Sequence, residues 1–149
     1  MSRIRFEIMH GVNLNALGRR DPKHYGGLTF DKLEQQISEY ARELEVETRF
    51  FQSNQEGEFV EHLLRIEDTA DAIIINPGAW THYAWAIHDA LEIANLPTVE
   101  VHLSDVKKRE AWRKVSVVSD VAIATISGKG AEGYRDAIVR LKKALPNAR

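Results

Sequence analysis

Five short apolar stretches, separated by stretches with helical periodicity, constrain this chain more than any other feature. Residues 71–76, DAIIIN, contain four consecutive apolar positions and end at the turn signal Asn76-Pro77-Gly78. Such continuous apolar strands are typical of parallel sheets that helices cover on both faces. The alternation therefore predicts an α/β fold with a doubly wound, five-stranded parallel sheet.

The same periodicities place the remaining elements. We expect strands at 3–9, 46–52, 71–76, 98–102 and 120–127, and helices at 29–44, 56–69, 84–94 and 130–145. The predicted strand order is flavodoxin-like, 2-1-3-4-5. In such sheets ligands bind beyond the carboxyl ends of the strands, at the switch point between strands 1 and 3. We therefore expect the loops 10–28, 76–82 and 102–113 to meet there.

Composition narrows the classes of function. The 149 residues suit one domain, spanning 1–149, and the net charge of −2 gives no reason to expect nucleic acid or an anionic membrane as a partner. The chain has no cysteine, which excludes disulfides, thiolate catalysis and Cys-ligated zinc. Since no apolar run reaches membrane-spanning length and no signal sequence is evident, we expect a cytoplasmic protein.

Two patterns that often mark cofactor sites lack their usual context. GKGAEG, at 128–133, matches G-x-G-x-x-G, but no later strand follows to supply a ribose-binding acid. A tight strand-to-helix turn explains it as well as dinucleotide binding does. His82 and His88 are six residues apart, which is a poor spacing for two metal ligands on a helix. We expect neither a metal nor an organic cofactor.

Polar residues that suit proton transfer gather on the three loops expected to meet. Each has a plain structural explanation when taken alone: Tyr25 can anchor a loop, Arg20 can pair with Asp21, and His102 can be a satisfied core histidine. Their convergence at one sheet edge favours a shared site. The set comprises Asn13, Arg20 and Tyr25, then Asn76 and His82, then Glu100, His102, Ser104, Arg109 and Arg113.

This set suits removal of a proton next to a carbonyl. A free phenol has a pKa of about 10, so few phenols are ionised at neutral pH, and a nearby guanidinium favours the phenolate. The first loop therefore needs Arg20 and Tyr25 together. Asparagine N–H groups can stabilise an enolate. His102 can protonate a leaving hydroxyl, with Glu100 on the same strand face holding its tautomer.

The stretch 104–114 has the composition of a mobile lid, because it is rich in long charged side chains and poor in apolar ones. Arg109 and Arg113, one helical turn apart, suit an anionic, hydroxylated substrate. Closure over the first loop brings Arg109 towards Arg20, a like-charge cost, so we expect the lid to stay open until an anion binds. Lys107-Lys108 is expected on its solvent face.

Five stretches resemble, in order and spacing, the motifs of one family. They are GVNLNALGRRDPKHYGG (11–27), QSNQEGEFVEHL (52–63), INPGAWTHYAWAIHDAL (75–91), VEVHLSDVKKREAWR (99–113) and SGKGAEGY (127–134). The corresponding family patterns are GPNLN-x-LG-x-RE-P-x-x-YG, QSN-x-EG, INPGA-x-TH, VEVHISN-x-x-x-RE-x-FR and SG-x-G-x-x-GY. Over essentially its whole length the chain resembles the type II 3-dehydroquinate dehydratases.

The resemblance implies a cofactor-free trans dehydration of 3-dehydroquinate to 3-dehydroshikimate through an enolate, in the shikimate pathway. It also implies a dodecamer of four trimers. The roles it implies are Tyr25 as base, Arg20 as its activator, Asn13 as enolate stabiliser through a water, His102 as acid and Glu100 as its orienting partner. It further implies Asn76, Leu103 and Ser104 as carboxylate binders, His82 and Arg113 as hydroxyl binders, Arg109 as the lid arginine, and Asp89 as an acid supplied to a neighbouring subunit's site.

The chain departs from the family patterns at positions that spare the implied base, acid and carboxylate binders. These departures bear on efficiency, lid behaviour and substrate preference. Two alternatives stay open: a related lyase for another cyclic hydroxy-keto acid, and a non-enzymatic anion-binding assembly protein. A biosynthetic role and a role in quinate breakdown also both stay open. The departures are His10, Val12, Ala84, Asp105, Lys107, Lys108, Ala111, Trp112 and Val117.

Overall fold

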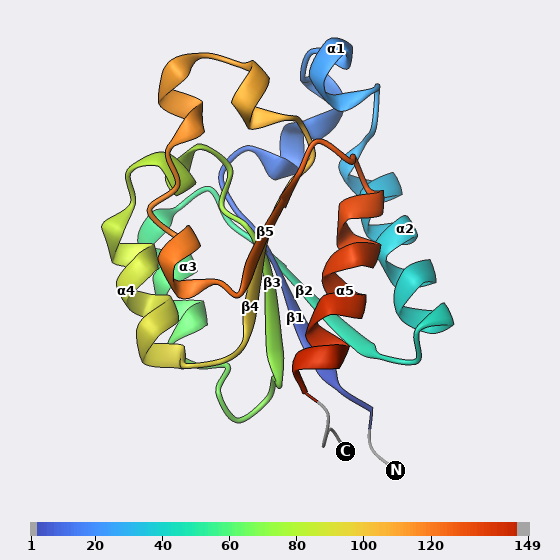
Figure 1. The fold of residues 1–149 in the computed structure, drawn as a ribbon, viewed down its shortest axis with the longest axis vertical. Helices are drawn as coiled ribbons and strands as arrows, with labels where there is room; N and C mark the ends of the chain where they lie inside the picture. The colour runs from blue at the N-terminus through green and yellow to red at the C-terminus, as the bar shows by residue number, and fades with distance from the viewer. Residues whose placement is uncertain (1–2, 146–149) are drawn as a thin grey trace.

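The fold centres on a five-stranded, all-parallel sheet in the order β2-β1-β3-β4-β5 (Figure 1). The structure is a computed structural model that describes residues 3–145. The predicted α/β class and strand order are confirmed. The strands are β1 (Arg5–His10), β2 (Glu47–Gln52), β3 (Ala72–Asn76), β4 (Thr98–His102) and β5 (Ala124–Ser127).

Helices cover both faces of the sheet: α3 and α4 lie on one side, α2 and α5 on the other (Figure 1). The α-helices are α1 (Pro22–Tyr25), α2 (Phe30–Glu43), α3 (Glu56–Leu63), α4 (Trp85–Ala94) and α5 (Glu132–Ala144). The 3₁₀ turns are η1 (Leu14–Arg19), η2 (Gly78–His82), η3 (Val106–Lys108), η4 (Ala111–Lys114) and η5 (Ser119–Val121). Among residues 3–145, no helix combines the length and apolarity needed to cross a bilayer.

The run in β3 shows why this sequence makes a buried central strand. Ile74 packs with α2 and α5 in one core cluster, whereas Ile73 and Ile75 pack with α3 and α4 in another. All three side chains are fully buried. Since successive side chains of a strand point to opposite faces, a strand between two helical layers must be apolar at every position.

Two predicted boundaries are wrong by more than two residues, and one expected loop contains helical turns. The second helix ends at Leu63 instead of continuing to 69, because Arg5 holds the carbonyl of Asp68 and the carboxylate of Asp71 and directs the chain into β3. The last strand begins at 124 instead of 120, since residues 119–121 form η5. The expected loop 10–28 contains η1 and α1.

Candidate active site

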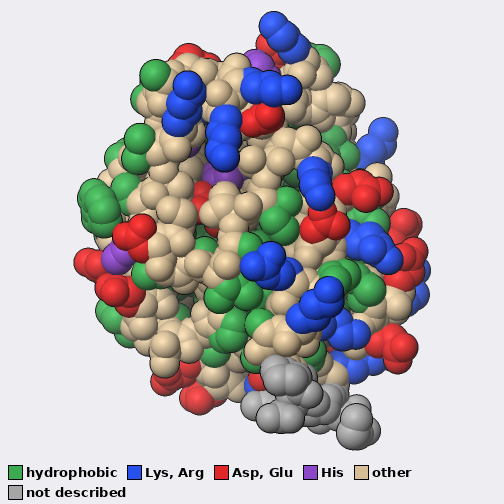
Figure 2. All heavy atoms as spheres, in the orientation of Figure 1, with side chains coloured by type: hydrophobic (Ala, Val, Ile, Leu, Met, Phe, Trp, Pro, Cys, Tyr) green, Lys and Arg blue, Asp and Glu red, His purple; other side chains and the backbone are tan. Residues whose placement is uncertain are grey.

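The segments that follow β1, β3 and β4 meet at the carboxyl edge of the sheet, as predicted. They enclose a cavity of about 170 Å³. Figure 2 shows Lys and Arg side chains gathered over this upper end of the molecule, with a histidine visible beneath them. Predicted site residues that line the cavity are Asn13, Arg20, Tyr25, Asn76, His82, His102, Leu103, Ser104, Arg109 and Arg113.

The hydroxyl of Tyr25 accepts hydrogen bonds from two guanidinium groups. Arg20 Nη2 lies 3.0 Å and Arg109 Nη1 lies 2.8 Å from the phenolic oxygen. Tyr25 is the last residue of α1, a short helix that Asp21 caps by accepting from the N–H of Lys23. Two guanidinium groups from different loops thus donate to one phenolic oxygen. The predicted pairing of Arg20 with Tyr25 is therefore present, and Arg109 adds a second donor.

His102 and Glu100 lie on one face of β4 and bond to each other. His102 Nε2 is 2.5 Å from Glu100 Oε2, and the Glu100 side chain is fully buried. Burial alone raises the pKa of Glu100, but hydrogen bonds from His102, Thr81 and Ser116 together bring that pKa below its ordinary value. A carboxylate that stays ionised fixes the proton on Nε2 of His102, so Nδ1 is the nitrogen left for chemistry in the cavity.

Asn76 is oriented by the turn that follows β3. Its Oδ1 accepts from the N–H of Gly78 at 3.0 Å, which fixes the orientation of the amide and makes Nδ2 its donor end. The chain passes tightly here: Gly78 has φ of +67°, and a Cβ on it would lie 2.6 Å from the backbone oxygen of Val12. Glycine is needed at this position because both the left-handed conformation and the space exclude a side chain.

His82 and Arg113 reach the cavity from η2 and η4. His82 Nδ1 is 2.6 Å from the carbonyl oxygen of Val115, which can only accept, so Nδ1 carries the proton. Burial lowers the pKa of His82 below the ordinary histidine value, with the charges of His102 and Arg113 acting in the same direction. The imidazole is therefore neutral near pH 7, and its Nε2 can accept a hydrogen bond.

The stretch 104–114 lies over the cavity, and its Arg109 lines the cavity wall. Arg109 Nη1 also donates to Ser104 Oγ at 3.2 Å. The like-charge cost is offset because Glu110 lies 4.0 Å from Arg109 Nε and 3.1 Å from Arg113 Nε. Arg109 and Arg113 are not one helical turn apart, because η3 ends at Lys108, before Arg109. Both side chains nevertheless line the cavity. The expected solvent placement of Lys107 and Lys108 is confirmed.

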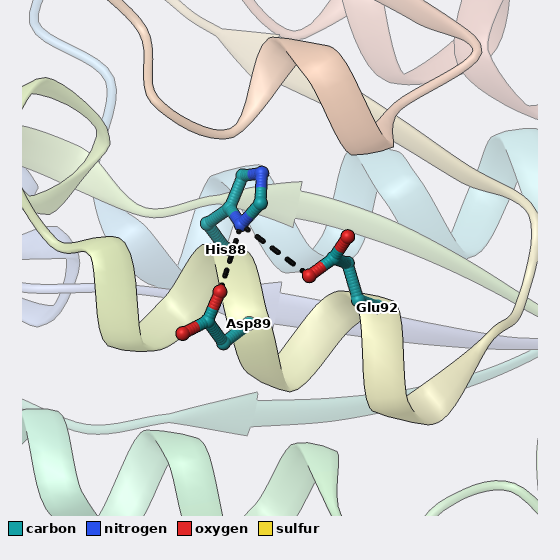
Figure 3. A group of neighbouring side chains, drawn as sticks. All are labelled: His88, Asp89 and Glu92. Carbon is teal, nitrogen blue, oxygen red and sulfur yellow. Dashed lines mark hydrogen bonds and ion pairs between the residues drawn. The ribbon is translucent and has the colours of Figure 1, made fainter.

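Asp89 does not join the other predicted site residues. It lies on α4 outside the cavity, next to His88 and Glu92 (Figure 3). His82 and Asp89 lie on different elements, η2 and α4. α4 begins only at Trp85, after a break at Tyr83, which has the non-helical φ, ψ of −155°, −8°.

The group in Figure 3 is the one set of three or more His, Asp or Glu residues, within residues 3–145, whose ligand atoms lie within 4.8 Å of one another. His88 Nδ1 is 3.1 Å from Asp89 Oδ1 and 3.8 Å from Glu92 Oε1, and His88 Nε2 is 3.8 Å from Asp120 Oδ2. Pairing of an imidazole with carboxylates accounts for this arrangement without a metal.

Sequence reasoning missed two polar residues that support the loop carrying Asn13. Asn54 Oδ1 accepts from the N–H of Asn13 at 2.7 Å and so supports its left-handed φ of +70°. Gln52 Nε2 bonds both Asn54 Oδ1 and the carbonyl of Gly11. Gln52 and Asn54 belong to the QSN stretch, whose position in a shared motif was the available signal.

Comparison with known proteins agrees with this geometry. The family model described as "Dehydroquinase class II" matches residues 4–142. The 3-dehydroquinate dehydratase of Caldicellulosiruptor saccharolyticus is 45% identical over 139 residues, covering 93% of this chain and 96% of that protein. That of Pelotomaculum thermopropionicum is 48% identical over 127 residues, covering 85% of this chain and 88% of the relative.

Solved structures show the same relationship. The type II dehydroquinase from Butyrivibrio crossotus superposes with a TM-score of 0.90 at 37% identity, covering 94% of this chain and 98% of that one. Sequence identity, coverage and fold thus agree. The chain belongs to the class II dehydroquinase family.

Proposed function

We propose that this chain catalyses the dehydration of 3-dehydroquinate to 3-dehydroshikimate in the shikimate pathway. One observation carries the proposal: the hydroxyl of Tyr25, held by Arg20 and Arg109, shares a cavity with the His102–Glu100 pair. The first group suits a base whose anion is stabilised by two cations. The second suits an acid whose charged form is stabilised by a buried carboxylate.

In the first step, the Tyr25 phenolate takes a proton from the carbon next to the ketone. The electron pair of the C–H bond moves to the ketone oxygen and forms an enolate. Asn13, acting through a water, stabilises that oxygen, and Arg20 and Arg109 offset the charge that the phenolate carries beforehand. A preorganised donor at an enolate oxygen contributes about 10²–10³ in rate.

In the second step, the enolate electrons return, a carbon–carbon double bond forms, and the bond to the leaving hydroxyl breaks. His102 supplies the proton from Nδ1, so the hydroxyl departs as water. Glu100 stabilises the imidazolium before the transfer and keeps the proton on Nε2 afterwards. A trans elimination requires the base and the acid to act on opposite faces of the ring, and Tyr25 and His102 come from different elements, α1 and β4. No cofactor enters this route.

Substrate binding in this proposal uses groups with fixed donor and acceptor directions. Asn76, through Nδ2, binds the carboxylate together with Leu103 and Ser104. The neutral His82, through Nε2, accepts from a ring hydroxyl, and Arg113 donates to another. A site that hydrogen-bonds ring hydroxyls discriminates against analogues without them, because its buried polar groups are then left unpaired.

We further propose the dodecamer of four trimers, with Asp89 reaching the cavity of a neighbouring subunit. Asp89 is exposed on α4, and the same helix exposes Trp85 and Ile93, at 58% and 65%. Figure 2 shows hydrophobic side chains at the surface on the side where α4 lies. Exposed apolar groups of this size favour an interface between copies. Sedimentation paired with assay tests this: a fully active monomer at high dilution contradicts the shared site.

The 149 residues are proposed to act as one dehydroquinase-like domain in the cytoplasm. A chain without cysteine gains nothing from an oxidising compartment. Fractionation of cells that express the protein tests the compartment.

The decisive experiment mixes purified protein with 3-dehydroquinate and follows the conjugated product by ultraviolet absorbance. We expect turnover in the wild type and its near loss, by about 10²–10⁴-fold, in Tyr25→Phe, because only the proton-accepting hydroxyl is removed. Tyr83→Phe is the matched control, since Tyr83 lies outside the cavity and is 57% exposed. Wild-type protein that turns over only another cyclic hydroxy-keto acid, or none, contradicts the proposal. Retained turnover in Tyr25→Phe contradicts the base assignment alone.

A further inference from the structure

Behind the proposed acid lies a group of hydroxyls that no part of the mechanism above uses. The buried carboxylate of Glu100 is within 2.5 Å of Thr81 Oγ1 and within 2.8 Å of Ser116 Oγ. Thr125 Oγ1 lies farther off, at 3.3 Å. Thr81 comes from η2, Ser116 from the segment after η4, and Thr125 from the edge strand β5. Three elements that are distant in sequence thus converge on one carboxylate.

The direction of each hydroxyl proton follows from its partners. A serine hydroxyl has one proton and two lone pairs. Ser116 Oγ lies 3.2 Å from the N–H of Val118 and 3.1 Å from that of Ser119, and these two donors occupy both lone pairs. The one proton of Ser116 must therefore go to Glu100. Ser116 also cannot accept from Thr81, 3.0 Å away, so the proton of Thr81 goes to Glu100 as well.

The segment that carries Ser116 is fixed to η2 on both sides of that residue. The carbonyl of Val115 bonds His82 Nδ1 at 2.6 Å, and the N–H of Val117 donates to the carbonyl of Thr81 at 2.8 Å. Ser116 is thus held between two contacts with η2. Its hydroxyl is placed by backbone bonds on either side, so it can in turn place the carboxylate.

We propose that Ser116, assisted by Thr81, is a positioning residue for the acid: it fixes the rotamer of Glu100 and thereby the orientation of His102. This inference rests on the proposed function, since it concerns the same acid. Ser116 acts through Glu100 and does not line the cavity. Without its proton, one oxygen of the carboxylate keeps only the distant hydroxyl of Thr125, and the side chain can turn away from the imidazole.

The titratable groups that face Glu100 are His102 on its own strand and His82 on η2. The neighbouring strand β3 contributes the apolar Ile75, and β5 contributes the hydroxyl of Thr125. The hydrogen bonds from Thr81 and Ser116 favour the ionised carboxylate. Removing one of them should allow Glu100 to protonate at higher pH, and the acid limb of the kcat profile should move in that direction.

The test compares Ser116→Ala with Ser119→Ala across pH, with 3-dehydroquinate as substrate. Ser119 is the matched control, because it lies on the same segment but its hydroxyl bonds only the backbone carbonyl of Ser116. We expect kcat to fall about ten-fold in Ser116→Ala with KM little changed, and the acid limb to shift to higher pH. Ser116→Thr, which keeps the hydroxyl, should restore both.

Separate results overturn the inference and the proposed function. Wild-type protein that does not convert 3-dehydroquinate overturns the function. An active wild type with a Ser116→Ala profile like that of Ser119→Ala overturns the inference alone. Circular dichroism and sedimentation of Ser116→Ala should match the wild type. If that variant unfolds, Thr81→Val supplies the second test, with the same expected shift of the acid limb, and an unshifted limb there also overturns the inference.

Discussion

Replacing Glu100 with glutamine isolates the charge of the buried carboxylate at nearly constant volume. In the wild type, both carboxylate oxygens accept, from His102 and Thr81 on one side and from Ser116 on the other. An amide keeps one accepting oxygen and presents N–H donors in place of the other. Whichever way it turns, at least one of these donors faces another donor.

The expected loss of stability follows from those partners. A hydrogen bond to a charged group contributes about 1.5–3 kcal/mol, and one or two of them are lost. The neutral amide is also less costly to bury than the carboxylate, which offsets part of this loss. We therefore expect Glu100→Gln to lower the free energy of unfolding by about 2–3 kcal/mol at pH 7. Turnover should fall by about 10²-fold, because the acid loses its orienting partner.

The stability difference between wild type and Glu100→Gln should depend on pH in a direction set by the pKa of Glu100. The pKa of Glu100 is lowered in the folded protein, so its contribution to stability is complete above the ordinary value of 4.5. That contribution is lost as pH falls through the folded-state pKa. Glutamine has no such titration. The difference in unfolding free energy between wild type and variant should therefore be largest at neutral pH and shrink below about pH 4.5.

The assay is urea unfolding at a series of pH values, followed by tryptophan fluorescence and circular dichroism. Protein concentration is held constant, because association contributes to apparent stability. Glu61→Gln removes the same charge from an exposed side chain, 3.5 Å from Arg65, and should change stability little at any pH. A Glu100→Gln difference that stays constant down to strongly acidic pH refutes the assignment of a stabilising, ionised carboxylate.

Two further predictions test the loops. Arg20→Ala should lower turnover by about 10²-fold with the fold intact, because one cation is lost from beside the proposed base. Arg19→Ala, at an exposed position, should leave turnover unchanged. Equal steady-state rates for the two variants refute the pairing of Arg20 with Tyr25. Gly11→Ala should lower the free energy of unfolding, measured with urea, by at least about 1–3 kcal/mol and should also lower activity. The reason is that its Cβ would overlap the backbone carbonyl of Pro77. A well-folded, fully active Gly11→Ala would contradict this close approach of the two loops.

The parts of the fold that the sequence predicts are those decided by local pattern. The apolar residues 72–75 of β3 are buried under two helical layers, and their continuous apolar pattern can be recognised in the sequence. The end of α3, in contrast, is not decided by local pattern. It depends on Arg5, which is 63 residues from the carbonyl of Asp68 that it binds. No window along the chain contains that contact.

The candidate site likewise has features that follow from the predicted topology and features that depend on long-range contacts. Parallel strands bring their carboxyl ends to one edge, so the meeting of Tyr25, Asn76 and His102 follows from topology. The proton directions around Glu100 do not, because they depend on Ser116, whose lone pairs are occupied by backbone groups in a turn that sequence alone did not predict. Asp89 was assigned only through resemblance, and it lies outside the chain's own cavity.

One segment connects the two halves of the proposed chemistry. Near its start, Arg109 donates to the hydroxyl of Tyr25, and near its end, Ser116 donates to the carboxylate of Glu100. The acid stands on β4, a buried strand that has little freedom to move, whereas the base stands on a four-residue helix. The segment between residues 104 and 119 adds, through Arg109, a hydrogen bond to the side chain at the end of α1. Any displacement of it removes a cation from the base and a donor from the acid's partner together. The observed arrangement of this segment therefore orients both residues that we propose as proton-transfer groups.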